Sequence, residues 1–227
     1  MCKLIAGLIA AVLASSSCLA SDLTTIETRW LNGVWPVVVF ANQAKLPLDI
    51  IVQPQATPDA APLALGFIDG RCKLVLSTRG NSEAQATLDR LEPDLLDAVL
   101  ELMAAHELGH CQRYLEGSWL SLPAGFAANV AAGLSADLRE AYVNMKAVRR
   151  EEGYADLVGL AWVQQHHRQK YARLHDWLVA ERSRDLIPGS HHDTLAWIQM
   201  AREGSALSRP SIFEAAAALW NRTATDP

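Results

Sequence analysis

The sequence lacks a surplus of positive charge, any internal repeat and, after its N-terminal leader, a long apolar run. Its 20 lysines and arginines stand against 25 aspartates and glutamates, for a formal net charge of −5. This mild acidity argues against nucleic acid as a partner. The longest later apolar stretch, Leu122–Leu134, is too short and too rich in alanine and glycine to span a bilayer, so we expect no integral membrane domain. The composition leaves the oligomeric state open.

Cysteine is scarce as well, and two of the four cysteines lie in the leader. Residues 1–20 have the pattern of a secretory signal peptide, in which Lys3 supplies positive charge and Leu4–Leu13 an apolar core. That core is shorter than the roughly 20 residues that span a bilayer. We therefore expect cleavage after Ala20 and a periplasmic or secreted protein. An uncleaved anchor and lipid attachment at Cys18 are the alternatives.

Turn residues divide residues 21–80 into short apolar segments. These segments carry Val, Ile and Phe, which favour β-strands, and Asp69-Gly70 is suited to close a hairpin. The expected strands are Val34–Phe40, Leu48–Val52 and one or two strands within Leu65–Ser77.

Helical periodicity dominates the rest of the chain. Pro93 suits a helix start, and apolar residues at helical spacing follow from Leu95. The other expected helices are Ser82–Leu91, Ala136–Val148, Arg149–Gln165, His166–Arg184, Asp193–Glu203 and Pro210–Arg222. The chain after the leader, residues 21–227, is long enough for one domain with its own core. We expect an α+β fold in which a small N-terminal sheet precedes a mainly helical part.

The first of these long helices carries the sequence HELGH at residues 106–110. On a helix, His106 and His110 leave the same face about 5–6 Å apart at Cβ. This spacing suits two ligands of one tetrahedral metal ion, with Glu107 beside them to accept and donate protons. The motif predicts a zinc site, provided that a third ligand exists.

The segment Glu151–Asp156 supplies such a ligand. Glu152 and Asp156 are four residues apart and share a helical face, whereas Glu151 pairs with Ala155 and is the weaker candidate. Two histidines and a glutamate leave a fourth zinc position open for water, as catalytic sites require. Because metal-bound histidines usually donate their other ring N–H to a carboxylate, Asp156 is well placed to orient one of them.

With HExxH on one helix and ExxxD on a later one, residues 93–160 resemble the gluzincin zinc metallopeptidases. The Glu-Gly-Tyr-Ala-Asp segment is most similar to the branch that contains the CAAX prenyl proteases and HtpX. The resemblance implies a zincin-like core, one Zn²⁺ bound by His106, His110 and Glu152, Glu107 as the general base, and Asp156 as the partner of a ligand. The membrane spans of that branch are missing, so the resemblance is to a soluble relative.

A weaker similarity to that branch lies at His191–Ile198, where the branch often has His-Pro-Pro-Thr-x-x-Arg-Ile. The His, Thr and Ile positions match, but Trp197 stands in the place of the arginine. A developing oxyanion needs a donor besides the metal. His191 is our first catalytic candidate for that role, with His192 next; the tyrosines that follow are Tyr142, Tyr154 and Tyr171.

Cys72 and Cys111 are the two cysteines left after cleavage, and in an oxidising compartment such a pair is a candidate disulfide. Two buried free thiols are the alternative. Cys111 follows His110 by one residue and points about 100° around the helix, away from the expected ligand face. It is therefore not expected to bind the metal.

The resemblance also implies an edge strand of the sheet that runs along the cleft and pairs with the substrate backbone. Lys73–Thr78 is our candidate for that strand, with an ordinary core strand as the alternative. His166, His167 and His175 lie on a charged stretch and are expected to be solvated helix residues.

Together these observations predict a zinc-dependent metallopeptidase, and more specifically an endopeptidase, that acts on peptide or protein substrates. Zinc would lower the pKa of its water toward ~7, and Glu107 would accept the proton as the water attacks the peptide carbonyl. Two alternatives stay open. One is a non-catalytic binding module that uses zinc for stability, and the other is a hydrolase of a different amide, such as a cell-wall peptide.

Overall fold

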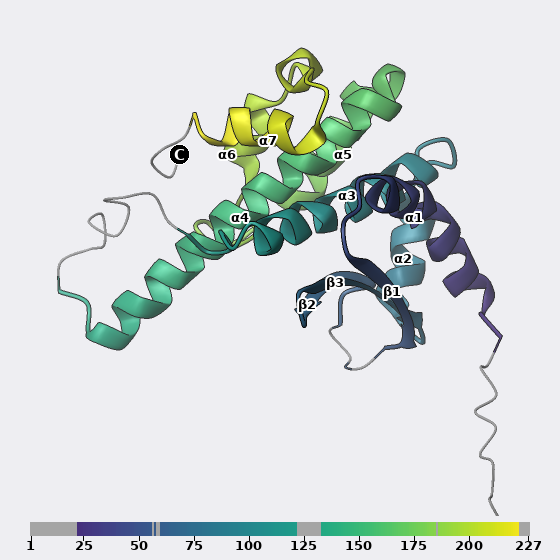
Figure 1. The fold of residues 1–227 in the computed structure, drawn as a ribbon, viewed down its shortest axis with the longest axis horizontal. Coiled ribbons are helices and arrows are strands. Elements are labelled where there is room, and N and C mark those ends of the chain that lie inside the picture. Colours follow the sequence, from purple (N-terminus) through teal and green to yellow (C-terminus); the bar gives the residue numbers. More distant parts are fainter. Residues whose placement is uncertain (1–21, 56, 58–59, 122–132, 185, 223–227) are drawn as a thin grey trace, which may run out of the picture.

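The computed structural model describes residues 22–55, 57, 60–121, 133–184 and 186–222. The expected signal peptide, with Cys18, and most of Leu122–Leu134 lie outside the described residues. The elements follow in the order α1 (Thr25–Gln43), β1 (Leu48–Pro54), β2 (Leu63–Ile68), β3 (Arg71–Arg79), α2 (Ser82–Arg90), α3 (Leu96–Leu115), α4 (Ala136–His166), η2 (Arg168–Lys170), α5 (Tyr171–Ser183), α6 (Leu195–Met200), η3 (Gly204–Leu207) and α7 (Ile212–Trp220) (Figure 1). A small sheet followed by helices confirms the predicted α+β fold.

The first element corrects a prediction, because Val34–Phe40 lies inside the helix α1 and forms no strand. The β-branched residues suggested a strand, but two helical features prevail over them. Thr24 and Glu27 form a capping box at the start of the helix. The apolar residues then recur at helical spacing and are buried: Trp30, Val34, Val37, Val38 and Ala41.

The sheet has the order β1-β3-β2, with β1 parallel and β2 antiparallel to β3. Asp69 and Gly70 have φ values of 51° and 72°, which is the left-handed geometry of a tight hairpin turn, so the predicted turn is confirmed. Lys73–Thr78 belongs to β3, the central strand. The prediction that this segment is an edge strand is therefore wrong, and the edge strand of the hairpin is β2.

Helices α3 and α4 pack closely because glycines lie at their contacts. A Cβ on Gly109 would lie 2.9 Å from the Cα of Ala155, and one on Gly159 would lie 3.0 Å from the carbonyl oxygen of Leu102. Since residues 109 and 102 meet residues 155 and 159 in that order, the two helices run in opposite directions. Gly109, inside the HELGH sequence, thus lets the backbone of the helix that carries Glu152 and Asp156 approach α3.

Helix α4 is continuous over 31 residues, so the two helices expected over Ala136–Val148 and Arg149–Gln165 are one. Its N-terminal part projects from the body of the molecule in Figure 1. Gly153, within α4, packs against Trp197 of α6, because a Cβ on Gly153 would lie 2.6 Å from the Trp197 ring.

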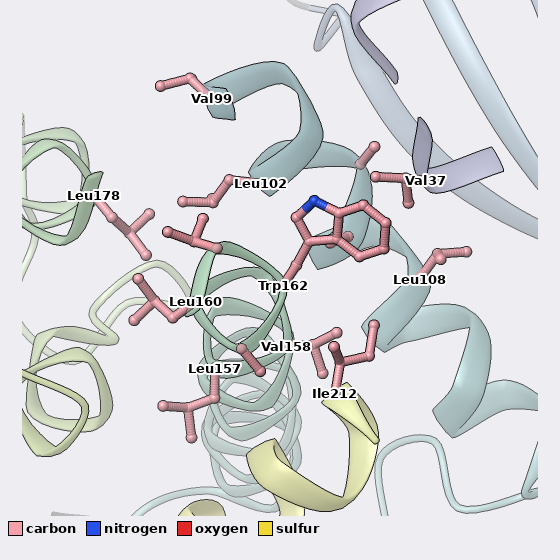
Figure 2. Packing of buried hydrophobic residues seen from close by; sticks show 14 of the residues in the cluster. Val37, Val99, Leu102, Leu108, Leu157, Val158, Leu160, Trp162, Leu178 and Ile212 are labelled. Atoms are coloured by element: carbon pink, nitrogen blue, oxygen red, sulfur yellow. The ribbon is translucent and has the colours of Figure 1, made fainter. Parts of the chain in front are cut away.

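A single hydrophobic cluster joins the elements from α1 to α7, and Trp162 of α4 lies fully inside it (Figure 2). Helix α3 lies within this cluster and contacts α1, β2 and α4. Cys72 and Cys111 form a disulfide with a Cα–Cα distance of 5.7 Å, which ties β3 to α3 one residue beyond His110. None of the described helices combines the length and the apolarity that a transmembrane helix needs.

Candidate metal centre

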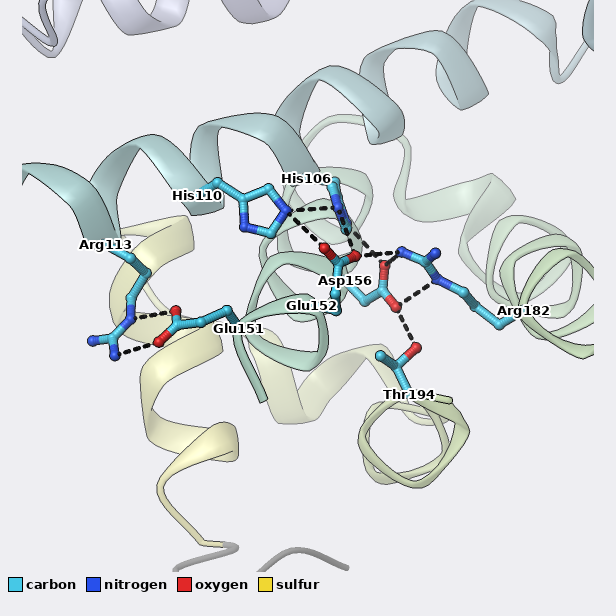
Figure 3. Close-up of polar contacts among 8 residues, drawn as sticks. All are labelled: His106, His110, Arg113, Glu151, Glu152, Asp156, Arg182 and Thr194. Carbon is cyan, nitrogen blue, oxygen red and sulfur yellow. Dashed lines mark hydrogen bonds and ion pairs between the residues drawn. The ribbon is translucent and has the colours of Figure 1, made fainter. Parts of the chain in front are cut away.

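The two motif histidines leave the same face of α3 and converge on Glu152 of α4 (Figure 3). The Nε2 atoms of His106 and His110 are 3.1 Å apart. One carboxylate oxygen of Glu152 lies 3.4 Å from Nε2 of His106, and the other lies 3.4 Å from Nε2 of His110. Among the described residues these three form the group whose geometry suits a metal ion. We call them the metal group.

The spacing of these atoms fits one tetrahedral zinc ion. Zinc bonds of about 2.0–2.1 Å at tetrahedral angles separate neighbouring ligand atoms by roughly 3.3 Å. Asp156 accepts a hydrogen bond of 2.9 Å from Nδ1 of His106, so a neutral His106 ring turns its Nε2 lone pair toward Glu152 and His110. A divalent cation is the partner that suits two imidazole nitrogens and a carboxylate oxygen together.

The electrostatics of the group also favour a positive charge at this place. Burial by itself would lower the pKa of His106, but the hydrogen bonds and charges of Asp156 and Glu152 raise it to about 10. Burial likewise opposes ionisation of Glu152, yet the two imidazoles hold its pKa well below the ordinary value. The carboxylates thus stabilise a cation beside them, whether a proton or a metal ion brings the charge.

Asp156 is the centre of a buried network behind His106. Besides the histidine, it accepts hydrogen bonds from Nε and Nη2 of Arg182, at 2.9 and 2.7 Å, and from the hydroxyl of Thr194 at 2.5 Å (Figure 3). Burial would raise the pKa of Asp156, but the charge of Arg182 and these hydrogen bonds keep it well below its usual range. The expected role of Asp156, holding His106, is the one its contacts support.

Arg182 of α5 was missed by sequence reasoning, which looked for an arginine only in the position of Trp197. Its Nη2 also lies 3.4 Å from Glu152, so it contacts both carboxylates that surround His106. The sequence did hold a sign of it. Leu174, Leu178 and Arg182 recur every four residues, and the two leucines are buried, so Arg182 continues the buried face of α5.

The histidines outside the metal group lie elsewhere. His175 is buried, and its ring lies 3.0 Å from the carbonyl oxygen of Ile198, so the expectation that it is solvated is wrong. Its face of α5 packs inward although the surrounding sequence is charged. His166 is exposed and stacks on Trp162, and His167 lies 2.8 Å from a carboxylate oxygen of Glu101.

A cavity of about 450 Å³ borders the metal group. Glu107 lines it, and burial raises the pKa of Glu107 against the opposing effect of His106 and His110. A cation at the metal group would lower this pKa again and keep the carboxylate ionised. The strand at this cavity is β2, through Leu63, Ala64 and Leu65. We had expected Lys73–Thr78 of β3 to lie along the cleft. The neighbouring strand, β2, lies there instead.

Of the two adjacent histidines near the C-terminus, His192 lines the cavity and His191 does not. The ring of His191 is exposed and lies against that of His192, with 4.0 Å between the ring centres. Burial lowers the pKa of His192, and the nearby charge of Arg182 adds to the effect. Of the tyrosines considered for this role none lines the cavity, whereas Tyr114, which we had not considered, does.

Comparison of the chain with known protein families, with curated proteins and with solved structures finds no match. The function is therefore inferred from the metal group and its surroundings.

Proposed function

We propose that the chain is a zinc-dependent endopeptidase that acts in the periplasm or outside the cell. The observation that carries the proposal is the convergence of His106 and His110 of α3 with Glu152 of α4, whose ligand atoms lie within 4.8 Å of one another beside a cavity. The donor set of two imidazoles and one carboxylate is that of a catalytic zinc site, which keeps a fourth position for water or substrate. The leader pattern and the Cys72–Cys111 disulfide support an oxidising location.

A zinc ion held there would supply a Lewis acid that polarises the scissile carbonyl and activates a water molecule. The chain's own residues divide the other tasks. The Glu107 carboxylate accepts the proton of the attacking water and delivers it to the leaving amine. Asp156 and Arg182 hold the ring of His106 in place. His192, which lines the cavity, replaces His191 as the candidate donor to the developing oxyanion.

The lining of the cavity favours action within a peptide over action at its ends. Along α3, Met103 lines the cavity before His106 and Tyr114 lines it after His110, and Trp119 lies against His110. Apolar and aromatic side chains before and after the two motif histidines suit a chain that continues past the scissile bond in both directions. The charged residues of the cavity lie around the metal group and on α5.

The test compares Glu107→Gln with the wild-type mature protein. The wild type is expected to bind one zinc per chain and to cleave an unfolded protein such as casein, whereas the variant keeps the zinc and loses at least about a hundredfold in turnover. Glu116→Gln, a change at an exposed glutamate of the same region, is the matched control and should behave as the wild type. Equal turnover in the wild type and Glu107→Gln would overturn the mechanism. Zinc binding without cleavage of any substrate, including cell-wall peptides, would favour the non-catalytic module.

A further inference from the structure

Three aromatic rings form a stack at one end of the cavity. The rings of Phe67 and Tyr114 are nearly parallel, with 4.9 Å between their centres and an angle of 6° between their planes. Trp119 lies on Tyr114 at 4.3 Å and 16°. The Trp119 ring also meets His110 almost at a right angle, at 5.0 Å. We call Phe67, Tyr114 and Trp119 the aromatic wall.

The aromatic wall is fixed by covalent and hydrogen-bonded contacts on the sheet side. Phe67 of β2 is paired with Cys72 of β3, and Cys72 is bonded to Cys111 of α3. Tyr114 follows Cys111 by three residues, so it leaves nearly the same face of the helix. The disulfide therefore brings the hairpin and the helix to the separation at which Phe67 and Tyr114 stack.

A buried ion pair fixes the other end. Arg113 donates to the carbonyl oxygen of Ser118, and the carboxylate of Glu151 accepts from the backbone N–H of Leu120. These two bonds hold the residues on either side of Trp119. Leu120 has a φ of 57°, a conformation that side chains with a Cβ rarely adopt, so the turn is kept by its contacts. Trp119 is thus positioned in advance beside His110.

Two rings of the aromatic wall reach the cavity. Tyr114 lies between the other two rings, which cover its faces, yet both Tyr114 and Trp119 line the cavity. Aromatic rings prefer to pair with one another in offset-stacked or edge-to-face arrangements. The side chains that can pair with the wall in this way are those of Phe, Tyr and Trp.

We infer that the aromatic wall binds an aromatic side chain of the substrate next to the scissile bond, and that Trp119 determines this specificity. The inference rests on the proposed function, and it names the class of peptide on which the site acts. The wall meets His110 directly, so the side chain it selects belongs to a residue close to the bond that is cut. Met103, which precedes His106 on α3 and lines the same cavity, accommodates side chains on the other side of that bond.

The first test uses a set of peptides in which Phe or Ala occupies each position around the cleaved bond. For one position we expect the wild type to prefer Phe by about tenfold or more in kcat/KM, and Trp119→Ala to reduce that preference to about twofold. Trp177→Ala removes an equally large ring, which α5 contributes to the lining of the cavity, and should change the preference at a different position. Trp35→Ala, at a tryptophan of α1 that is 50% exposed, controls for the loss of a tryptophan as such. An unchanged profile in Trp119→Ala would overturn the inference.

The second test measures binding without catalysis. Zinc-loaded Glu107→Gln protein is titrated calorimetrically with every pair of Phe and Ala peptides in the set, so that no cleavage is needed to choose a peptide. The pair with the largest difference in affinity is then measured with and without Trp119→Ala. We expect about tenfold tighter binding of the Phe peptide, reduced to about twofold without Trp119. Equal affinities for the two peptides in Glu107→Gln would contradict the inference. Failure of the proposed function would look different. The wild type would then bind the Phe peptide through Trp119 but cleave no peptide.

Discussion

Glu151 and Glu152 are neighbours on α4, yet they belong to two different buried regions between α3 and α4. Glu152 faces His106 and His110 in the metal group. Glu151 faces Arg113, whose Nε and Nη2 donate to its two carboxylate oxygens at 2.8 and 2.9 Å (Figure 3). We call Arg113 and Glu151 the arginine pair. Consecutive helical residues point about 100° apart, so one step along the helix moves a carboxylate from one region to the other.

The two regions differ in whether the protein alone completes them. In the arginine pair the carboxylate of Glu151 accepts hydrogen bonds from the planar guanidinium group of Arg113, which has five donors. The centre of the Trp220 ring lies 4.8 Å from the guanidinium carbon. In the metal group the Nε2 atoms of two imidazoles face each other and a carboxylate at 3.1–3.4 Å. The first arrangement is balanced by the charges of its two members, whereas the second is a donor set that we propose to bind a metal ion. Burial of a glutamate therefore does not by itself distinguish the proposed ligand; its partners across the helix contact do.

The largest expected effect separates the two glutamates by their zinc binding. Glu152→Gln removes a proposed ligand, so zinc affinity should fall by more than the roughly 100-fold that loss of a residue behind a ligand causes. Glu151→Gln should keep a zinc content near one per chain. Metal analysis after dialysis against a weak chelator measures both. Retention of zinc by Glu152→Gln, or its loss from Glu151→Gln alone, would erase the distinction between the regions.

The next effect is on stability. Here Glu151→Gln should be the more damaging of the two variants. Glu151→Gln leaves the buried guanidinium of Arg113 with only the half-exposed Glu116, at 3.7 Å, as a counter-charge, and removing one partner of a buried pair costs about 3–5 kcal/mol. In the metal-free protein Glu152→Gln should cost far less. Urea unfolding of both variants in the presence of a chelator gives the two free energies of unfolding. A smaller loss for Glu151→Gln than for Glu152→Gln would show that the arginine pair is not the structural one.

Much of this comparison was accessible from the sequence, because both regions are built on helical spacing. Four-residue intervals placed His106 with His110 and Glu152 with Asp156, and they set Glu151 apart from both. Local patterns also predicted the hairpin turn at Asp69-Gly70. The disulfide prediction came from the small number of cysteines and the expected compartment, and the structure contains it.

What the sequence hid depends on contacts between distant elements. Arg182 reaches Asp156 from a helix that looked charged and superficial, and its burial is decided by how α5 packs. Val34–Phe40 has strand-forming residues, but packing of α1 against α3 favours a helix, and Gly33 allows the approach of Leu100. The order of strands in the sheet, which makes β2 the edge, is set by pairing partners and not by the composition of any strand.

A smaller effect on zinc affinity is expected from the residues that hold the metal group in place. Asp156→Asn keeps the shape of the side chain but weakens its hold on His106 and Arg182, so zinc affinity should fall by about 10- to 100-fold. Thr194→Val removes only one of the hydrogen bonds to Asp156 and should have a lesser effect. Competition for zinc with a chromogenic chelator measures both affinities. An Asp156→Asn protein with wild-type affinity would mean that the network behind His106 supports folding only.

The smallest expected effect on stability concerns a third carboxylate, that of Glu27, which lies outside both regions. Glu27 forms an ion pair that is partly exposed to solvent. Its side chain is 1% exposed, whereas that of its partner Arg79 is 32% exposed. The hydrogen bonds from Arg79, helped by those from Thr24, outweigh burial and lower the pKa of Glu27 from 4.5 to about 2. Because the pKa is lower in the folded state, the stabilisation is present above about pH 4.5 and disappears as the pH falls toward 2.

Glu27→Gln should therefore lower the free energy of unfolding by about 1–2 kcal/mol at pH 7, since solvent at Arg79 screens the pair. The difference between wild type and variant should shrink steadily between about pH 4.5 and pH 2. Urea unfolding at several pH values measures it, with Glu151→Gln alongside as the more deeply buried reference. If Glu27→Gln loses as much unfolding free energy as Glu151→Gln, exposure of the arginine does not decide the strength of these pairs. A loss that does not change with pH would exclude the charge of Glu27 as its cause.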